Sequence, residues 1–157
     1  SGYKGLAIKN HPSSKAAILP MNLGKLYFLH GYEQHKNILL DVIDYLYPAA
    51  TDLVKTNAHE RVEVILQNYI RNVPENIGKK EPDGMILHLV NLTGFSGNTY
   101  FSPLPINDVS FSIKSDFKPA KMSGMVDDQA IDFKWDNGRL TFKVKTLDDF
   151  EGIIIEK

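Results

Sequence analysis

The chain has 157 residues, enough for one domain or two small ones, and it contains no cysteine. Lys and Arg number 18 against 19 Asp and Glu, so the formal net charge is −1 and the basic footprint of a nucleic-acid-binding protein is missing. The absence of cysteine excludes thiol nucleophiles, zinc–thiolate sites and disulfides. No apolar run is long enough to predict a membrane span.

The first region, up to about residue 58, predicts a strand pair and one helix. Two short apolar runs, GLAI (5–8) and KAAILP (15–20), flank a turn-rich spacer and are typical of paired strands. The segment EQHKNILLDVIDYLYP (33–48) then carries apolar residues at helical spacing, with Glu33 in the first turn and Pro48 as the stop. The helix's apolar positions are Ile38, Leu39, Val42, Ile43 and Leu46.

The second region, residues 59–157, changes to a period of two. Apolar residues alternate with polar ones in segments 61–69 and 108–115, whereas MILHLVNL (85–92) is apolar on both faces, as in a central strand. In IDFKWDNGRLTFKV (131–144), Asn137-Gly138 is typical of a type I′ hairpin turn, and Trp135 and Phe142 are expected in the core. GIIIEK (152–157) is a last strand, and the polar segment 71–84 is a long hairpin loop.

The predicted fold class is therefore α+β and mainly β. A short strand pair plus one helix (residues 1–58) precedes an antiparallel, Ig-like β-sandwich of six or seven short strands (residues 59–157). A lone helix on a small sheet leaves one sheet face uncovered, so either the sandwich covers that face or part of an α/β domain is missing upstream. The start at Ser1-Gly2 without methionine leads us to expect that the native chain begins further upstream.

Candidate chemistry is weak throughout the sequence. His30 and His35 are five residues apart, not the four that place two histidines on one metal, so we expect no metal site. His88 lies in a strand without a positioned serine nearby, and we expect a structural histidine. The adjacent pairs Asp127-Asp128 and Asp148-Asp149 are typical of turns rather than of a glycosidase carboxylate pair.

Two features remain after residue 90. Asn91-Leu92-Thr93 has the form of an N-glycosylation sequon. The aromatic residues Phe95, Tyr100 and Phe101 follow in a segment punctuated by Gly and Pro. These rings either form a sugar-binding platform or plug the end of the sandwich or pack on a neighbouring domain.

Several motifs together resemble a known family. The segment AAILPMNLGKLYFLHGYEQHKNILLDVIDYLYP (16–48) is similar to the last strand and helix of the beta-galactosidase-trimerisation-like α/β domain of bacterial glycoside hydrolases related to family 42. Segments 62–69, 85–94, 103–113 and 147–157 resemble the β-sandwich that ends those enzymes, and HLVNLTG (88–94) is the most specific piece. The first segment matches at Pro20, Leu23, Gly24, Tyr27, Gly31, Tyr32 and His35.

The resemblance implies a non-catalytic role. In that family both catalytic carboxylates belong to an upstream (β/α)8 barrel, so this chain would contain no catalytic residue, metal or cofactor. It would be a C-terminal accessory region, flavodoxin-like in its first part, whose partners are the barrel and α/β domain of the same parent protein. A homo-oligomer and a carbohydrate are further candidate partners, and the family suggests a bacterial periplasmic or extracellular location.

Two functional classes therefore stay open. The first is the accessory region of a carbohydrate-active enzyme, giving structural support or an oligomer contact. The second is an independent carbohydrate-binding or adhesion module. Candidate residues for a carbohydrate site or an interface are Phe95, Tyr100, Phe101, His30 and Tyr32.

Overall fold

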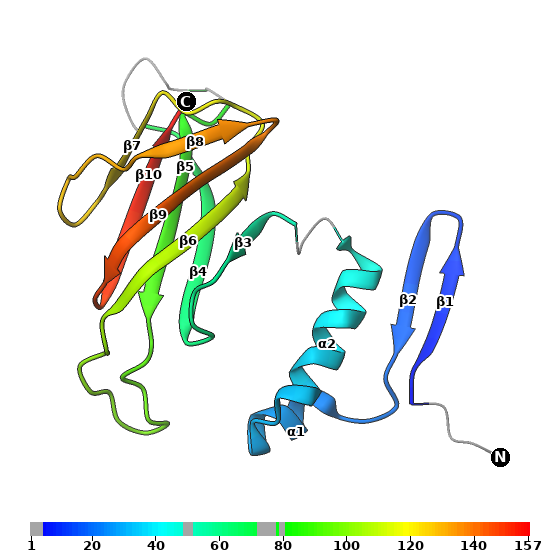
Figure 1. The fold of residues 1–157 in the computed structure, drawn as a ribbon. Helices are drawn as coiled ribbons and strands as arrows, with labels where there is room; N and C mark the ends of the chain where they lie inside the picture. The colour runs from blue at the N-terminus through cyan, green and yellow to red at the C-terminus, as the bar shows by residue number, and fades with distance from the viewer. Residues whose placement is uncertain (1–4, 49–51, 72–77, 79–80) are drawn as a thin grey trace. The chain divides into compact units, whose positions relative to one another are not determined.

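The computed structural model describes residues 5–48, 52–71, 78 and 81–157, and the chain forms two compact units, Ser1–Leu53 and Val54–Lys157 (Figure 1). The predicted loop of residues 71–84 lies mostly outside the described residues. The predicted boundary after residue 58 differs from the division into units, because a strand at residues 54–56 belongs to the sandwich. None of the described helices is long and apolar enough to cross a membrane.

The first unit contains a hairpin and two helices. The predicted strand pair is confirmed: β1 (Ala7–His11) pairs antiparallel with β2 (Ser14–Ile18) around Pro12-Ser13. The helices are α1 (Leu23–His30) and α2 (Glu33–Leu46), so the prediction of one helix was wrong. The side chain of Asn22 accepts a hydrogen bond from the Lys25 N–H at the start of α1, and Gly31 ends this helix with φ 64°.

Polar contacts join the hairpin to α2. The Tyr45 hydroxyl donates to Asn10 Oδ1 at 2.9 Å, and Lys15 Nζ donates to the Tyr45 carbonyl and lies 4.7 Å from the centre of its ring. No residue of α2 is fully buried, and Ile38 and Ile43 are exposed. Among the described apolar residues of this unit, Leu23 alone is fully buried.

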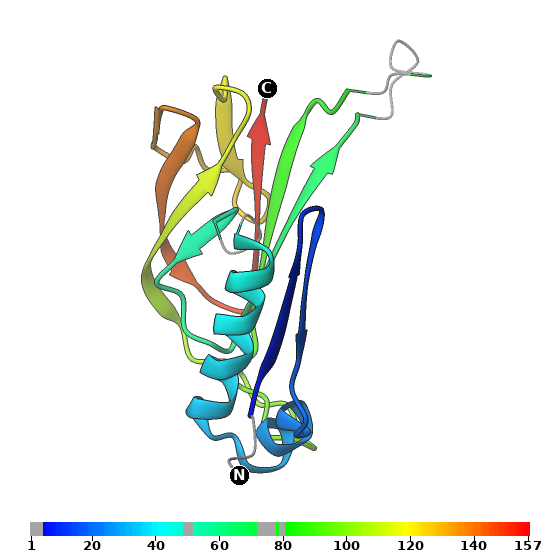
Figure 2. The same ribbon diagram turned by 90° about the vertical axis from the view of Figure 1, so that its right-hand side faces the viewer.

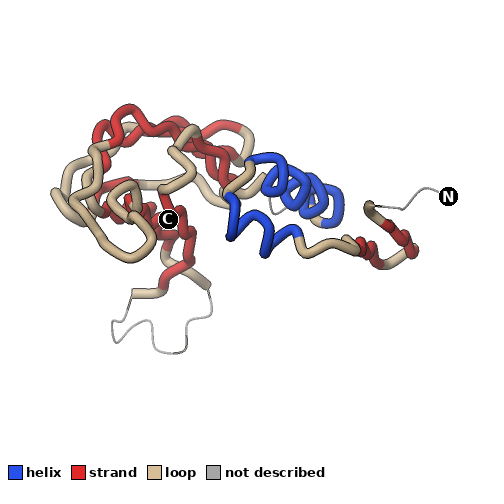
Figure 3. The backbone as a smooth tube through the Cα atoms, turned by 90° about the horizontal axis from the view of Figure 1, so that it is seen from below, coloured by secondary structure: helices blue, strands red, loops and turns tan. Residues whose placement is uncertain are grey.

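The second unit is an antiparallel β-sandwich, as predicted (Figure 2). One sheet has the strand order β4-β5-β10-β7 and the other β3-β6-β9-β8; Figure 3 shows the two layers of strands from below. The predicted strand MILHLVNL is central, as β5, between β4 and β10. The strands are β3 (Val54–Thr56), β4 (Val62–Tyr69), β5 (Gly84–Asn91), β6 (Ile106–Lys114), β7 (Lys121–Gly124), β8 (Phe133–Asp136), β9 (Arg139–Leu147) and β10 (Phe150–Glu156).

The core lies between these sheets and follows the period of two. Along β9 the buried Leu140, Phe142 and Val144 alternate with exposed Thr141 and Lys143. Phe142 stacks on its cross-strand partner Phe111 with the ring centres 5.4 Å apart. The β8–β9 hairpin turns at Asn137 (φ 49°) and Gly138 (φ 78°), which confirms the predicted turn.

The prediction that Trp135 belongs to the core was wrong. Its side chain is 36% exposed, although its strand partner Leu140 is fully buried. β8 is a four-residue strand at the edge of its sheet, so an inward-pointing ring near its end is only partly covered. Phe133, nearer the start of the strand, does pack against the core.

We therefore predict unequal stabilities for two aromatic truncations. Phe142→Ala removes a ring that is 5% exposed and should lower the free energy of unfolding by roughly 3–5 kcal/mol. Trp135→Ala removes a ring already more than one third exposed and should cost about 1 kcal/mol or less. Urea denaturation measures both losses, and similar losses for the two variants would contradict the assignment.

We also predict that the two units differ in local stability. Because the first unit buries so little apolar surface, its amides in residues 5–48 should exchange at least tenfold faster than those of β5 and β10. The exposed apolar residues should make the chain self-associate, as light scattering would detect. A monomer with slow exchange throughout the first unit would show that the unit is stable as it stands.

Candidate functional site

The strongest candidate site is the loop of residues 92–105 between β5 and β6, called the aromatic loop below. Figure 1 shows it extending beyond the ends of these two strands. Four of its apolar side chains are exposed: Phe95 by 47%, Tyr100 by 53%, Phe101 by 63% and Leu104 by 73%. Clustered exposed apolar residues usually mark a surface that meets another molecule or domain.

The loop is held from below by Asn91, the last residue of β5. Asn91 is fully buried, and its Nδ2 donates to the carbonyl oxygens of Leu104 at 2.8 Å and Asp148 at 2.7 Å. Its Oδ1 accepts from the backbone N–H and the hydroxyl of Thr93, at 3.1 and 2.8 Å. The amide therefore ties the start of the loop to its far end and to the β9–β10 turn.

A second set of contacts fixes the backbone of the loop. The Tyr100 hydroxyl donates to the Asn91 carbonyl at 2.8 Å, and Arg61 Nη1 donates to the Phe95 carbonyl. A Cβ on Gly94 would lie 2.0 Å from the Phe101 carbonyl oxygen, so only glycine fits there. These contacts thus fix the backbone of the loop, although its rings face outward.

The arrangement of the rings does not form one flat platform. Phe95 and Tyr100 are antiparallel bridge partners, and such partners point to the same side of the ribbon. Phe101 follows Tyr100 and is directed to the opposite side. A sugar could stack on one side of the loop, whereas an interface with another protein surface could use both.

The sequon residue Asn91 is not an available glycan acceptor in this fold. Its side chain is fully buried, and its amide nitrogen already donates to two carbonyl oxygens. The sequence analysis did not identify Asn91 as the residue that holds the loop in place. The signal was its place at the end of a central strand, just before Thr93 and Gly94.

The other two predicted site residues, His30 and Tyr32, lie in the first unit at the junction of α1 and α2. Their rings stack with centres 5.6 Å apart, and Tyr32 meets His35 edge-on at the same distance. Nδ1 of His35 is buried without a hydrogen-bond partner in the described part of the chain. The three rings thus form a small cluster at the helix junction.

The described residues contain no group of three or more His, Asp or Glu side chains that could hold a metal ion. His88 is half-buried on β5 and stacks on Phe150, with ring centres 6.1 Å apart, as expected of a structural histidine. Asp128, with φ 52°, lies in the β7–β8 connection, and Asp148 and Asp149 lie in or beside the β9–β10 turn. These acidic pairs are turn residues, as predicted.

Two further carboxylates, those of Glu151 and Glu156, have partners that stabilise the fold. Glu151 Oε1 accepts from the backbone N–H groups of Met125, Val126 and Gly152 at 2.9–3.2 Å, and so fixes the β7–β8 loop. Glu156 pairs with Arg71, and this hydrogen bond raises the pKa of Arg71 above its ordinary value. Neither arrangement presents a free carboxylate opposite another across a cleft.

Comparison with solved structures shows where this fold recurs. The chain is similar to part of alpha-L-fucosidase isoenzyme 2 from Paenibacillus thiaminolyticus, with a TM-score of 0.67 and 16% identity, covering 89% of this chain and 20% of that one. A cycloisomaltooligosaccharide glucanotransferase from a Paenibacillus species, complexed with cycloisomaltoheptaose, matches with a TM-score of 0.40 and 15% identity, over 78% of this chain and 20% of that one. The second likeness is too weak to carry an argument.

This chain therefore spans about one fifth of the length of the fucosidase chain that it resembles. The second unit is only about two thirds of the present chain, so the match includes residues of both units. At 16% identity the likeness shows the fold alone. No protein-family model matches the sequence, and no curated protein sequence is significantly similar to it.

We predict that the amide of Asn91 is required for the loop and the sandwich to hold together. Asn91→Asp keeps the shape but places a buried carboxylate against two carbonyl oxygens, and should lower the unfolding free energy by about 2–4 kcal/mol. Asn98→Asp makes the same charge change at an exposed position of the same loop and should cost about 0.5 kcal/mol or less. Equal unfolding free energies for the Asn91→Asp and Asn98→Asp variants in urea denaturation would refute the role of Asn91.

Proposed function

We propose that this chain is a non-catalytic accessory region of a carbohydrate-active enzyme and supports the structure or assembly of a glycoside hydrolase. The observation that carries the proposal is the fold match to one fifth of a fucosidase chain, which extends over both units. An accessory region is expected to share such a combination of parts with a larger enzyme. The resemblance to enzymes related to family 42 points in the same direction.

The first unit fits this role as the end of an α/β domain. It has a hairpin and two helices, and most of its large apolar residues are exposed in the part of the unit that the structure describes. Further strands of a flavodoxin-like sheet would bury Ile8, Ile18 and Ile43, which are 45%, 66% and 48% exposed. In this proposal, residues 1–58 continue an upstream domain of the same bacterial parent protein.

The aromatic loop is then an interface with the rest of the parent or with a second copy. Asn91 and Gly94 fix its backbone with the rings already exposed, so the loop need not rearrange when it docks. Rings on both sides of the ribbon suit contact with a protein surface better than stacking on a single sugar.

We predict that the isolated chain does not hydrolyse glycosides. A panel of aryl glycosides should show no turnover above a heat-denatured control, because Asp127 and Glu151 accept hydrogen bonds from backbone N–H groups and the pair Asp148-Asp149 lies at a turn. Turnover by rigorously purified chain that Asp149→Asn or Glu151→Gln abolishes would contradict the proposal.

The second candidate function, an independent carbohydrate-binding module, is favoured by the exposure of the loop rings. A binding module should bind neutral oligosaccharides in calorimetric titration and lose this binding on Phe101→Ala. An accessory region should bind none of them through this loop. Binding that survives Phe101→Ala and also survives Phe95→Ala combined with Tyr100→Ala would exclude the loop as the platform.

A further inference from the structure

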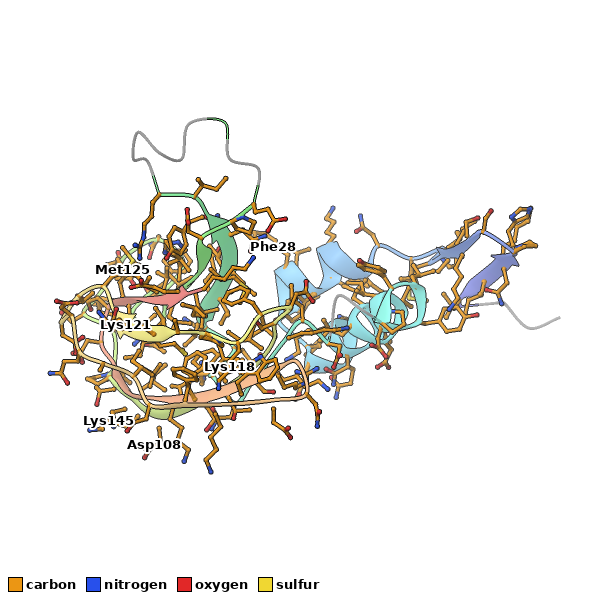
Figure 4. All side chains as sticks on the ribbon, turned by 90° about the horizontal axis from the view of Figure 1, so that it is seen from above. Phe28, Asp108, Lys118, Lys121, Met125 and Lys145 are labelled. Atoms are coloured by element: carbon orange, nitrogen blue, oxygen red, sulfur yellow. The ribbon has the colours of Figure 1, made fainter. Side chains whose placement is uncertain are left out.

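The edge strands of the two sandwich sheets differ in how well they are protected against pairing with another chain. An edge strand carries a row of unpaired backbone N–H and C=O groups, and short length, lysine and proline commonly protect it. The edges β3, β7 and β8 have only three or four residues, and each contains a lysine. These are Lys55, Lys121 (labelled in Figure 4) and Lys134.

The fourth edge strand, β4, lacks this protection. It is eight residues long, VEVILQNY, and contains no lysine, proline or glycine. Valine, isoleucine and tyrosine are residues that favour strands. In the described part of the chain β5 is the one strand that pairs with β4, so the other side of β4 is an open edge.

The register of β4 shows which of its backbone groups face the open side. The Leu92 N–H donates to the Arg61 carbonyl at 2.8 Å, so Arg61 and every second residue after it direct their backbone groups toward β5. The backbone groups of Val64 and Leu66 therefore face away from β5. Their side chains pack against the core, whereas Ile65 between them faces outward and is 36% exposed.

The sequence of β4 is self-complementary about Ile65. When two copies of the strand run antiparallel with Ile65 opposite Ile65, Val64 of each copy lies opposite Leu66 of the other. These two residues then pair through the backbone groups that face the open side, and each pair exchanges two hydrogen bonds. On the outer face Glu63 lies opposite Gln67, whose amide can donate to the carboxylate.

Neighbouring registers fit less well. Pairing centred on Val64 would place Glu63 opposite Ile65, and pairing centred on Leu66 would place Ile65 opposite Gln67. A register centred between two residues would set inward side chains opposite outward ones. The register centred on Ile65 is therefore the one that matches apolar residues with apolar residues and polar with polar.

We propose that two copies of this chain associate through β4, with a twofold axis at Ile65, so that their two sheets become one. The inference rests on the strand and its register, and it does not depend on the proposed function. Val64 and Leu66 of the two copies extend the core across the new contact. The twofold arrangement covers the open edge of both copies at once, so the assembly closes as a dimer.

Sedimentation of the complete 157-residue chain, at concentrations up to roughly 1 mM, tests the proposal. Ile65→Lys places two ammonium groups directly opposite each other and should weaken the dimer at least tenfold. Gln67→Lys is the matched control, because it adds a lysine to the same face of the same strand but opposite Glu63, and it should leave the dimer as tight or tighter. Thermal melting shows whether each variant is folded.

A chain that stays monomeric throughout this range would overturn the proposal. Association that Ile65→Lys leaves unchanged would also overturn it, because the contact would then lie elsewhere, for example on the exposed apolar residues of the first unit. Equal weakening by Ile65→Lys and Gln67→Lys would overturn the register.

A cross-link locates the twofold axis independently. Because the chain contains no cysteine, Ile65→Cys introduces a single thiol that should form a disulfide between two copies under a mild thiol oxidant. Glu63→Cys is the control, since the two thiols would be four residues apart along the strands, about 14 Å, which is beyond the reach of a disulfide. Equal yields of linked dimer from the two variants on a non-reducing gel, or no linked dimer from Ile65→Cys, would contradict the proposed pairing.

Discussion

The buried amide of Asn91 is the contact on which the sandwich end and its loop depend. It lies where β5 ends, and it bonds the chain at Thr93, at Leu104 and at the turn before β10. Without these bonds the fully buried amide of Asn91 would be a polar group without a partner. One side chain thereby allows a central strand to end in an ordered loop that displays aromatic rings.

The two units contrast in how they are stabilised. The sandwich has a continuous core of alternating side chains from both sheets, including Leu87, Ile113 and Ile153, all fully buried. The first unit relies on local hydrogen bonds, helix caps and the contacts of Tyr45. In the part of the first unit that the structure describes, a hairpin and two helices bury one apolar residue and are marginal by themselves, which is the physical basis for the proposal that they belong to a larger domain.

Much of the sandwich could be predicted because its strands keep a clean period of two and its hairpin carries Asn137-Gly138. β3 and β7 were missed, since three or four residues are too few to show a period. α1 was missed although Asn22 and Gly31 are ordinary cap signals, because eight mostly apolar residues are too few to show a helical period. The prediction for Trp135 was wrong for another reason. Alternation shows on which face of a strand a residue lies, but it does not show whether the opposite sheet covers the end of that strand.

The candidate site was only partly predictable. The sequence indicates that Phe95, Tyr100 and Phe101 lie in a loop, but their exposure depends on how Asn91 and Gly94 fix the backbone. The register of the second sheet joins Lys55 to Lys134 through segments far apart in the chain. Such register cannot be deduced from single strands.

In the proposed role this chain contributes surfaces to an enzyme rather than chemistry of its own. The most direct test is to isolate the native polypeptide that carries this sequence with an antibody against the sandwich, and to measure its mass and its glycosidase activity. We expect a polypeptide several times heavier than 17.7 kDa that hydrolyses glycosides. A native species of about 17.7 kDa, or a large one without such activity, would contradict it.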